Sequence, residues 1–216
     1  MSDARITVQA RDGEGGFIIT SAGIAGEATL GSLSLLGAGS FLTVTATGAD
    51  DAFVDGSVAY TVVTAPAISA DADYSGGDPA DVTLTNADDD VVGINVTSTA
   101  GLSTTEVGGT ATFTIMLTSQ PAADVTIALA SFDLTEGTVA PASLAFTALD
   151  WNSPQTVTVT GVDDAIVDGP VAYTIVTSPA VSADPGYSGL DAPDVGVTNT
   201  DNDVAGITVN PNARLV

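Results

Sequence analysis

An internal repeat constrains the fold of this chain more than any other feature of its sequence. Residues 50–96 match residues 163–209 at an offset of 113 positions, with 31 identities over 47 positions. All four tyrosines lie in the repeat as matched pairs, Tyr60 with Tyr173 and Tyr74 with Tyr187. Because a repeat of this length indicates a duplicated structural module, we expect the 216 residues to form tandem copies of one fold.

Short strand signals separated by turn residues fill the second copy. Residues 110–117, TATFTIML, alternate in polarity after the Gly108-Gly109 turn, and a short strand is expected near Thr138-Val139. The other expected strands are GINVTS, ADVTIALAS, SLAFT, QTVTVTG, VAYTIVT and DVGVTNT. Seven or eight such strands are typical of an antiparallel β-sandwich. No stretch combines a 3.6-residue apolar period with caps, so we expect almost no helix.

The module boundaries follow from the offsets within the repeat. Residues 91–203 are predicted to form a complete module, and residues 1–90 an abbreviated one. From Ile6 to Asp50 is 44 positions, whereas the matching distance in the second copy is 69, a deficit of 25 positions. That deficit corresponds to two or three strands. Residues 204–216 repeat residues 91–103 and are expected to form the first strand of a further module, centred on Ile207, Thr208 and Val209.

The charge of the chain excludes several classes of function. It has 27 acidic residues, only three basic residues and a formal net charge of −24. Such a field repels nucleic acid and anionic membranes, and no run approaches 18 apolar residues. We therefore expect no nucleic-acid partner and no membrane insertion.

Residue types that the chain lacks argue against an enzyme. There is no His, Cys or Lys, which removes the commonest general base, thiol nucleophiles and Schiff-base chemistry. A carboxylate pair could still hydrolyse glycosides. However, the Asp pairs recur in both copies, which suits a structural role better than a unique active site.

In several segments the sequence resembles the Calx-beta family. The segments that carry this resemblance are TTEVGGTATFTIMLTSQPAADVTIAL, SLAFTALDWNSPQTVTVTGVDD, VDGPVAYTIV and the terminal NTDND. It covers residues 91–203 and the second half of the first copy. The resemblance implies immunoglobulin-like antiparallel β-sandwiches whose loops at one end bind Ca²⁺. It also implies an extracellular or cell-surface location, since tandem modules of this kind occur in large bacterial surface and adhesin proteins.

Clustered carboxylates are the candidate Ca²⁺ ligands, because Ca²⁺ takes six to eight oxygens from flexible loops. In the second module the acids that resemble the family's loop positions are Glu106, Asp133, Glu136, Asp163, Asp164, Asp168, Asp201 and Asp203. In the first module they are Asp50, Asp51, Asp55, Asp88, Asp89 and Asp90. The first module has no match for Asp133 or Glu136, so its site should bind fewer ions or bind them more weakly.

A simpler interpretation of the acids stays open, because Asp caps turns without any metal and Asp168-Gly169 is itself a turn signal. Like charges at this density would destabilise the fold unless cations neutralise them, which favours Ca²⁺. The acid pairs Asp71/Asp184, Asp78/Asp191 and Asp81/Asp194 are interpreted as solvated loop residues.

Three functional hypotheses follow. The first is an extracellular structural or adhesive Ca²⁺-binding repeat of a bacterial surface, cell-adhesion or biofilm-matrix protein. In its sharper form, residues 204–216 of one copy complete the first module of the next, giving a head-to-tail filament. The alternative is that adjacent repeats of a longer array are the partners. The second hypothesis is a calcium-sensing protein-binding module, and the third is an accessory domain of a larger secreted protein.

Overall fold

The structure, a computed structural model, describes residues 5–12, 15–22, 27–29, 41–64, 66, 72, 73 and 75–207, and only the backbone of residues before 45. The described residues form strands, turns and loops without any helix, so none of them forms a helix able to cross a membrane. The chain divides into two compact units, Met1–Asp90 and Val91–Val216. The predicted all-β fold class is confirmed.

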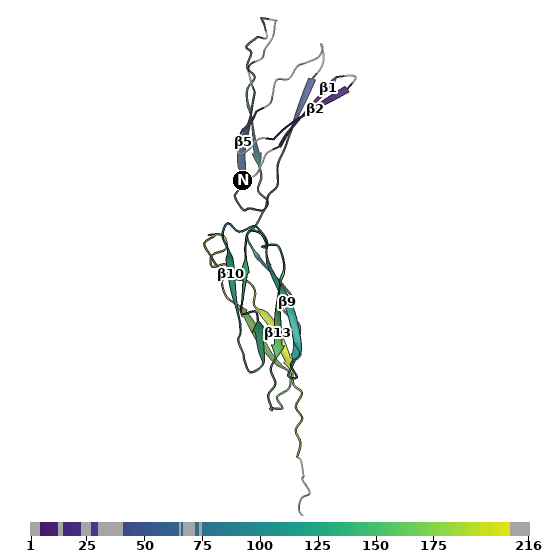
Figure 1. The fold of residues 1–216 in the computed structure, drawn as a ribbon, viewed down its shortest axis with the longest axis vertical. Coiled ribbons are helices and arrows are strands. Elements are labelled where there is room, and N and C mark those ends of the chain that lie inside the picture. The colour runs from purple at the N-terminus through teal and green to yellow at the C-terminus, as the bar shows by residue number, and fades with distance from the viewer. Residues whose placement is uncertain are drawn as a thin grey trace, which may run out of the picture. The chain divides into compact units, whose positions relative to one another are not determined.

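The second unit is a sandwich of two sheets (Figure 1). One sheet has the order β12 (Ser143–Phe146), β10 (Val125–Ser131), β14 (Val171–Thr177), β16 (Val195–Thr200) and β8 (Leu102–Thr105), and β15 (Val181–Ser182) also pairs with β10. The other has the order β11 (Gly137–Ala140), β13 (Gln155–Gly161), β9 (Thr110–Leu117) and β7 (Ile94–Thr97). All pairs are antiparallel except β16 with β8.

Alternating side chains of both sheets form the core of the second unit. On β9, Phe113, Ile115 and Leu117 are buried while the intervening residues are not. They pack in one cluster with buried residues of the facing sheet, such as Phe146 of β12. The expected core face of β14 is largely correct: Tyr173 and Ile175 are buried, and Val171 is half-buried. Trp151, expected to be a core or end plug, is half-buried and packs against this cluster.

The described backbone of the first unit forms two three-stranded sheets. One has the order β2 (Gly15–Ala22), β1 (Arg5–Asp12) and β4 (Phe41–Thr47). The other has the order β3 (Glu27–Thr29), β5 (Val58–Val63) and β6 (Val82–Asn86). β3 runs parallel to β5, a short pairing that the glycine-punctuated sequence around it did not predict.

Strands β5 and β6 correspond to β14 and β16 at the offset of 113 residues. In the second unit, β16 pairs with both β14 and β8, whereas within the described residues β6 pairs only with β5. The difference also reaches the side chains: Val195 of β16 is fully buried, but its counterpart Val82 is 51% exposed. Of the described side chains of the first unit, Tyr60 and Val62 are the buried apolar ones. The first unit therefore covers its apolar face less completely than the second, as far as it is described.

One pair of acids has a structural role in both units. The Asp194 Oδ1 accepts hydrogen bonds from the backbone N–H of Thr177 (2.9 Å) and from its hydroxyl (3.2 Å). Asp81 accepts the same two bonds from Thr64, at 2.8 and 3.2 Å. The interpretation of Asp81 and Asp194 as merely solvated loop acids is therefore wrong, because each fixes the end of a strand to a loop 17 residues away.

Candidate metal centre

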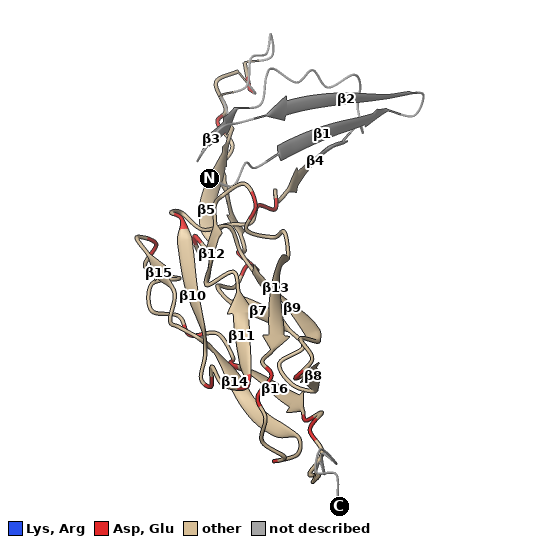
Figure 2. Cartoon of the chain, turned by 60° about the horizontal axis from the view of Figure 1, so that its bottom comes forward, with Lys and Arg blue, Asp and Glu red and all other residues tan. Residues whose placement is uncertain are grey.

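The acids of the second unit gather at one end of the sandwich, where four connections meet (Figure 2). Glu106 follows β8, Glu136 lies between β10 and β11, Asp164 and Asp168 lie between β13 and β14, and Asp201 follows β16. The strands deliver these loops to the same end because β8, β10, β13 and β16 all finish there. We call this end of the second unit the acidic tip.

Two overlapping groups of carboxylates at the acidic tip have the spacing of a metal site. Glu106, Asp168 and Asp201 form one group, and Glu136, Asp164 and Asp168 form the other. Within each group the carboxylate oxygens lie within 4.8 Å of one another. Glu106 and Glu136 are buried, at 3% and 5% exposure, whereas Asp168 is exposed and belongs to both groups. The arrangement suits two cation positions that share the Asp168 carboxylate.

Backbone amides hold the acids of the acidic tip in place. The Asp201 Oδ2 accepts a hydrogen bond from the Gly169 N–H at 2.8 Å, which ties the end of β16 to the loop before β14. Its Oδ1 accepts from the Asp203 N–H at 2.6 Å. Gly169 has a φ of 76°, a left-handed conformation that glycine adopts without steric cost. The turn that presents Asp168 therefore depends on the glycine that follows it.

Asn199 joins the acidic tip to the core. Its side chain is 1% exposed, and its amide donates to the Val162 carbonyl at 3.0 Å and to the Glu136 Oε2 at 3.4 Å. Its Oδ1 accepts from the Thr104 hydroxyl at 3.0 Å. Asn199 was missed at the level of sequence, although its pairing with Asn86 in the repeat was a usable signal. Asn86 donates at 2.8 Å to the carbonyl of Ala49, the residue that corresponds to Val162.

Three predicted ligands lie outside the two carboxylate groups. The Asp133 Oδ1 accepts hydrogen bonds from the Thr135 hydroxyl (2.6 Å) and N–H (3.0 Å), which lower the pKa of Asp133 and close a turn. The Asp163 Oδ1 accepts from the Asn202 side chain at 3.0 Å. Asp203 has a buried Oδ2 with no hydrogen-bond partner in the described part of the chain. Of the three, Asp203 offers the oxygen that most needs a cation.

Electrostatic repulsion in the acidic tip shows in the pKa values of its acids. Burial raises the pKa of Asp203, and the negative charge of Asp201 raises it further. The Asn202 N–H lowers the pKa of Glu106, but burial and the neighbouring acids outweigh it, so that the net shift is upward. The pKa of Asp201 is lowered, chiefly by the N–H groups of Asp203 and Gly169. A bound cation would relieve the repulsion at Asp203 and Glu106.

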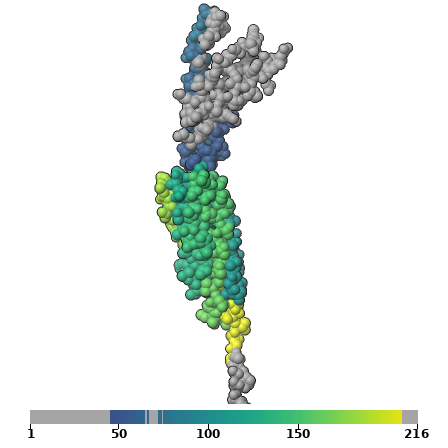
Figure 3. All heavy atoms as spheres, viewed as in Figure 1, coloured from purple at the N-terminus to yellow at the C-terminus, as the bar shows by residue number. Residues whose placement is uncertain are grey.

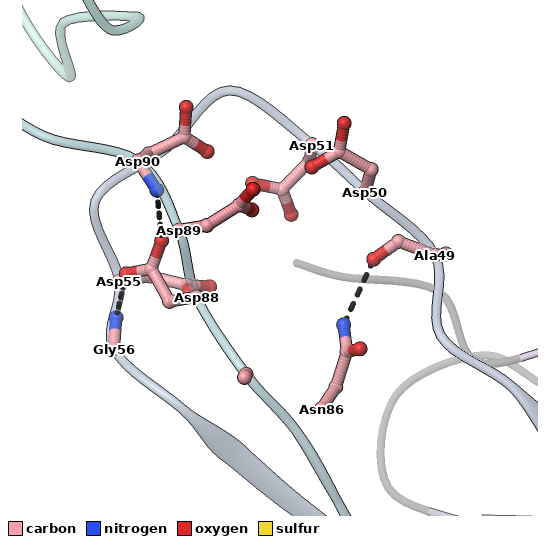
Figure 4. A pocket seen from close by; sticks show the side chains of 10 residues that line it. Ala49, Asp50, Asp51, Asp55, Gly56, Asn86, Asp88, Asp89 and Asp90 are labelled. Atoms are coloured by element: carbon pink, nitrogen blue, oxygen red, sulfur yellow. Dashed lines mark hydrogen bonds between the residues drawn. The ribbon is translucent and has the colours of Figure 1, made fainter.

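The first unit repeats part of this site. Its six predicted ligands line one pocket between the loop after β4 and the loop after β6 (Figure 4): Asp50, Asp51, Asp55, Asp88, Asp89 and Asp90. Asp88 accepts from the N–H groups of Gly56 (2.6 Å) and Asp90 (3.0 Å), as Asp201 accepts from Gly169 and Asp203. Burial raises the pKa of Asp90, and the acids around it, Asp50 first, raise it further.

The donor set of both sites fits Ca²⁺. Every donor identified here is an oxygen, which suits a hard cation such as Ca²⁺ and not a metal that prefers nitrogen or sulfur. In the described residues, two buried side-chain oxygens lack a hydrogen-bond partner, the Oδ2 atoms of Asp51 and Asp203. One lies in each acidic cluster. An unpaired buried carboxylate oxygen is costly unless a cation meets it, so the residues present fit the ion.

Replacing Asp203 by Asn is expected to have opposite effects with and without Ca²⁺. Because the folded-state pKa of Asp203 is raised, its ionised form destabilises the metal-free fold at neutral pH. We expect Asp203→Asn to raise the metal-free midpoint of thermal unfolding by roughly 2 °C and to lower the midpoint in Ca²⁺. The metal-free gain should shrink as the pH falls through the folded-state pKa, where the wild-type carboxyl becomes protonated. Thermal unfolding followed by circular dichroism, in chelator and in Ca²⁺, measures both effects.

Asp133→Asn is the matched control for this prediction. The pKa of Asp133 is lowered by its hydrogen bonds with Thr135, so its ionised form stabilises the fold at neutral pH. The substitution should therefore lower the metal-free midpoint. An equal loss in Asp203→Asn and Asp133→Asn would show that repulsion at Asp203 is negligible.

The predicted donor strand lies only partly within the described residues. Ile207 is 94% exposed, whereas Thr208 and Val209 lie outside the described residues.

Comparisons with known proteins give structural neighbours and no family. Neither the protein-family models nor the curated proteins include a match. Among solved structures, the chain is similar to WR4, an MSP family member from C. elegans (15% identity, 50% of this chain and 97% of that one, TM-score 0.35). It is also similar to a PapD-like domain of human CEP192 (9% identity, 52% and 87%, TM-score 0.39). The third neighbour is domains 4 and 5 of the S-layer protein SbsC (18% identity, 74% and 82%, TM-score 0.31). Similarities at this level do not assign a function.

Proposed function

We propose that this chain is a Ca²⁺-stiffened structural repeat of an extracellular bacterial surface or matrix protein, built from Calx-beta-like sandwiches. The observation that carries the proposal is the acidic tip, where two carboxylate groups share Asp168. Nothing in the site favours catalysis over this role: its groups are carboxylates held by backbone amides, and the same arrangement recurs in the first unit at the offset of 113 residues.

The recurrence supports a structural role because it places a cation clamp at the end of each sandwich. In each unit the clamp joins the loop that precedes β5 or β14 to the chain that leaves β6 or β16. A cation bound there would neutralise acids that otherwise repel one another, and would stiffen the exit of the chain. The acid-rich composition with a net charge of −24 is tolerable where Ca²⁺ is abundant, as it is outside cells.

Head-to-tail assembly is the finer part of the proposal. The first unit has a strand, β6, whose second edge is unpaired within the described residues. Residues 204–216 repeat the opening of a module, and the exposed Ile207 stands at their start. We infer that residues 204–216 of one copy add a strand to the first unit of another. Contacts of this kind are heterologous and extend into a filament.

Isothermal titration calorimetry with Ca²⁺ tests the metal site. We expect binding to the intact chain, and a loss of about tenfold or more in affinity at the second unit on Asp168→Asn, because both carboxylate groups lose a ligand. Asp124→Asn is the matched control, since Asp124 is an exposed acid in the connection between β9 and β10, at the other end of the sandwich. A heat of binding that Asp168→Asn and Asp124→Asn leave equally intact would remove the acidic tip as the site.

A calcium-sensing module is the second candidate. It shares the acidic tip and differs in expecting a large rearrangement on binding. Amide hydrogen exchange separates the two: a structural clamp protects the loops of the tip, whereas a sensor also changes protection across β9 and β13.

A further inference from the structure

Exposed aliphatic side chains surround the acidic tip. They are Val107, Leu134, Ile166, Val167 and Val204, with exposures of 76%, 68%, 62%, 54% and 87%. We call these five residues the apolar collar. Each lies within two positions of an acid of the tip; Val107, for example, follows Glu106 directly. Loop residues at the surface are ordinarily polar, so aliphatic side chains concentrated around one site indicate a contact surface.

The chain itself indicates what would cover the apolar collar. Val204 and Ile207 continue from Asp203 out of the tip, and Figure 3 shows the chain leaving the second unit at this end (yellow). Ile207 is only four residues beyond Asp203, a span of at most about 14 Å. A partner that pairs with the strand beginning at Ile207 must therefore lie directly against the collar.

The charge of the tip selects among partners. Apart from Arg214 in the tail, the basic residues of the chain are Arg5 and Arg11, and both belong to β1 of the first unit. The acidic tip has no basic residue of its own. The first unit of another copy therefore combines the unpaired edge of β6 with the two cations that complement the tip, whereas an anionic lipid surface would be repelled.

We propose that the apolar collar is a docking surface for the first unit of a second copy of this chain, engaged when a cation occupies the acidic tip. The inference rests on the strand donation proposed above and adds a second contact to it. Strand pairing alone supplies main-chain hydrogen bonds, and burial of the collar supplies the apolar area that stabilises the junction. Cation binding removes the charge that would otherwise be desolvated along with the collar.

Sedimentation velocity of the intact protein in Ca²⁺, over a concentration series, tests the inference. The test variant carries Leu134→Ser and Val167→Ser, and the control is Leu149→Ser. Leu149 is 94% exposed in the connection between β12 and β13, at the other end of the sandwich. We expect the double variant to weaken self-association roughly tenfold or more and the control to leave it unchanged. Both should keep the wild-type Ca²⁺ affinity and melting temperature, because the replaced side chains are outside the core.

Further arms separate failure of the collar from failure of strand donation. Deleting residues 204–216 should abolish association. Association lost on that deletion but unaffected by the double variant would overturn the collar and leave strand donation intact. An intact protein that stays monomeric in Ca²⁺ would overturn both, while calorimetry still decides Ca²⁺ binding separately. Co-sedimentation with phosphatidylserine vesicles covers the rival partner: vesicle binding lost in the double variant, with self-association unchanged, would also overturn the inference.

Discussion

Removal of Ca²⁺ is expected to lower the thermal midpoint of the second unit by on the order of 10 °C. An ion present at 100 times its dissociation constant adds about 2.7 kcal/mol to the free energy of unfolding, and a domain of this size loses roughly 4 °C per kcal/mol. The effect should be large because chelation also restores repulsion between Asp203 and the acids around it. Scanning calorimetry of the intact chain, with Ca²⁺ and with excess chelator, measures the shift.

Two controls make this result interpretable. Mg²⁺ at the same concentration should restore less of the midpoint, because it demands a smaller and more regular set of oxygens. In Asp168→Asn, the difference between Ca²⁺ and chelator should largely vanish. If chelation leaves the wild-type midpoint unchanged, the acidic tip consists only of solvated turns.

Asn199→Ala is expected to lower the free energy of unfolding of the second unit by about 3 kcal/mol. The substitution leaves three groups without this partner in a buried place: the Val162 carbonyl, the Thr104 hydroxyl and the Glu136 carboxylate. Each buried polar group left unsatisfied costs about 1–3 kcal/mol. Urea unfolding followed by the fluorescence of Trp151, the sole tryptophan and part of this unit, measures the loss.

The repeat supplies an internal comparison for this substitution. Asn86→Ala removes the corresponding hydrogen bond to Ala49, but Asn86 is only half-buried, so water can replace its partner. Its cost should be about 1 kcal/mol. Equal losses at Asn199 and Asn86 would show that burial of Asn199 adds nothing to its role.

Much of the second unit could be predicted from sequence because its strands alternate. The expected strand at residues 110–117 coincides with β9, since every second residue of TATFTIML faces the core. β8 was missed because LSTT is mostly polar, and its pairing depends on the remote strand β16. Local sequence carries no signal for such a partner. The parallel pairing of β3 with β5 was missed for the same reason.

At the level of the site, residue type could be predicted but not the partner of each oxygen. The repeat brought attention to Asp201 and Asp168, which the structure places together. It could not distinguish them from Asp133, whose Oδ1 is already occupied by Thr135. Nor could it distinguish Asp194, whose carboxylate fixes Thr177. Which acids remain free to bind a cation depends on hydrogen bonds between loops, and those require the folded backbone.

The pairing of β16 has a mechanical consequence. Val91 enters the second unit beside Thr118, beyond the last residue of β9, and the chain leaves after β16 at the acidic tip. A pull between these two points acts along the strands, so the hydrogen bonds of β16 to β14 and to β8 are loaded together, in shear. Such bonds must break nearly simultaneously rather than one after another. The unit is thus arranged to transmit tension along a chain, with the parallel β8–β16 pair as its force-bearing element.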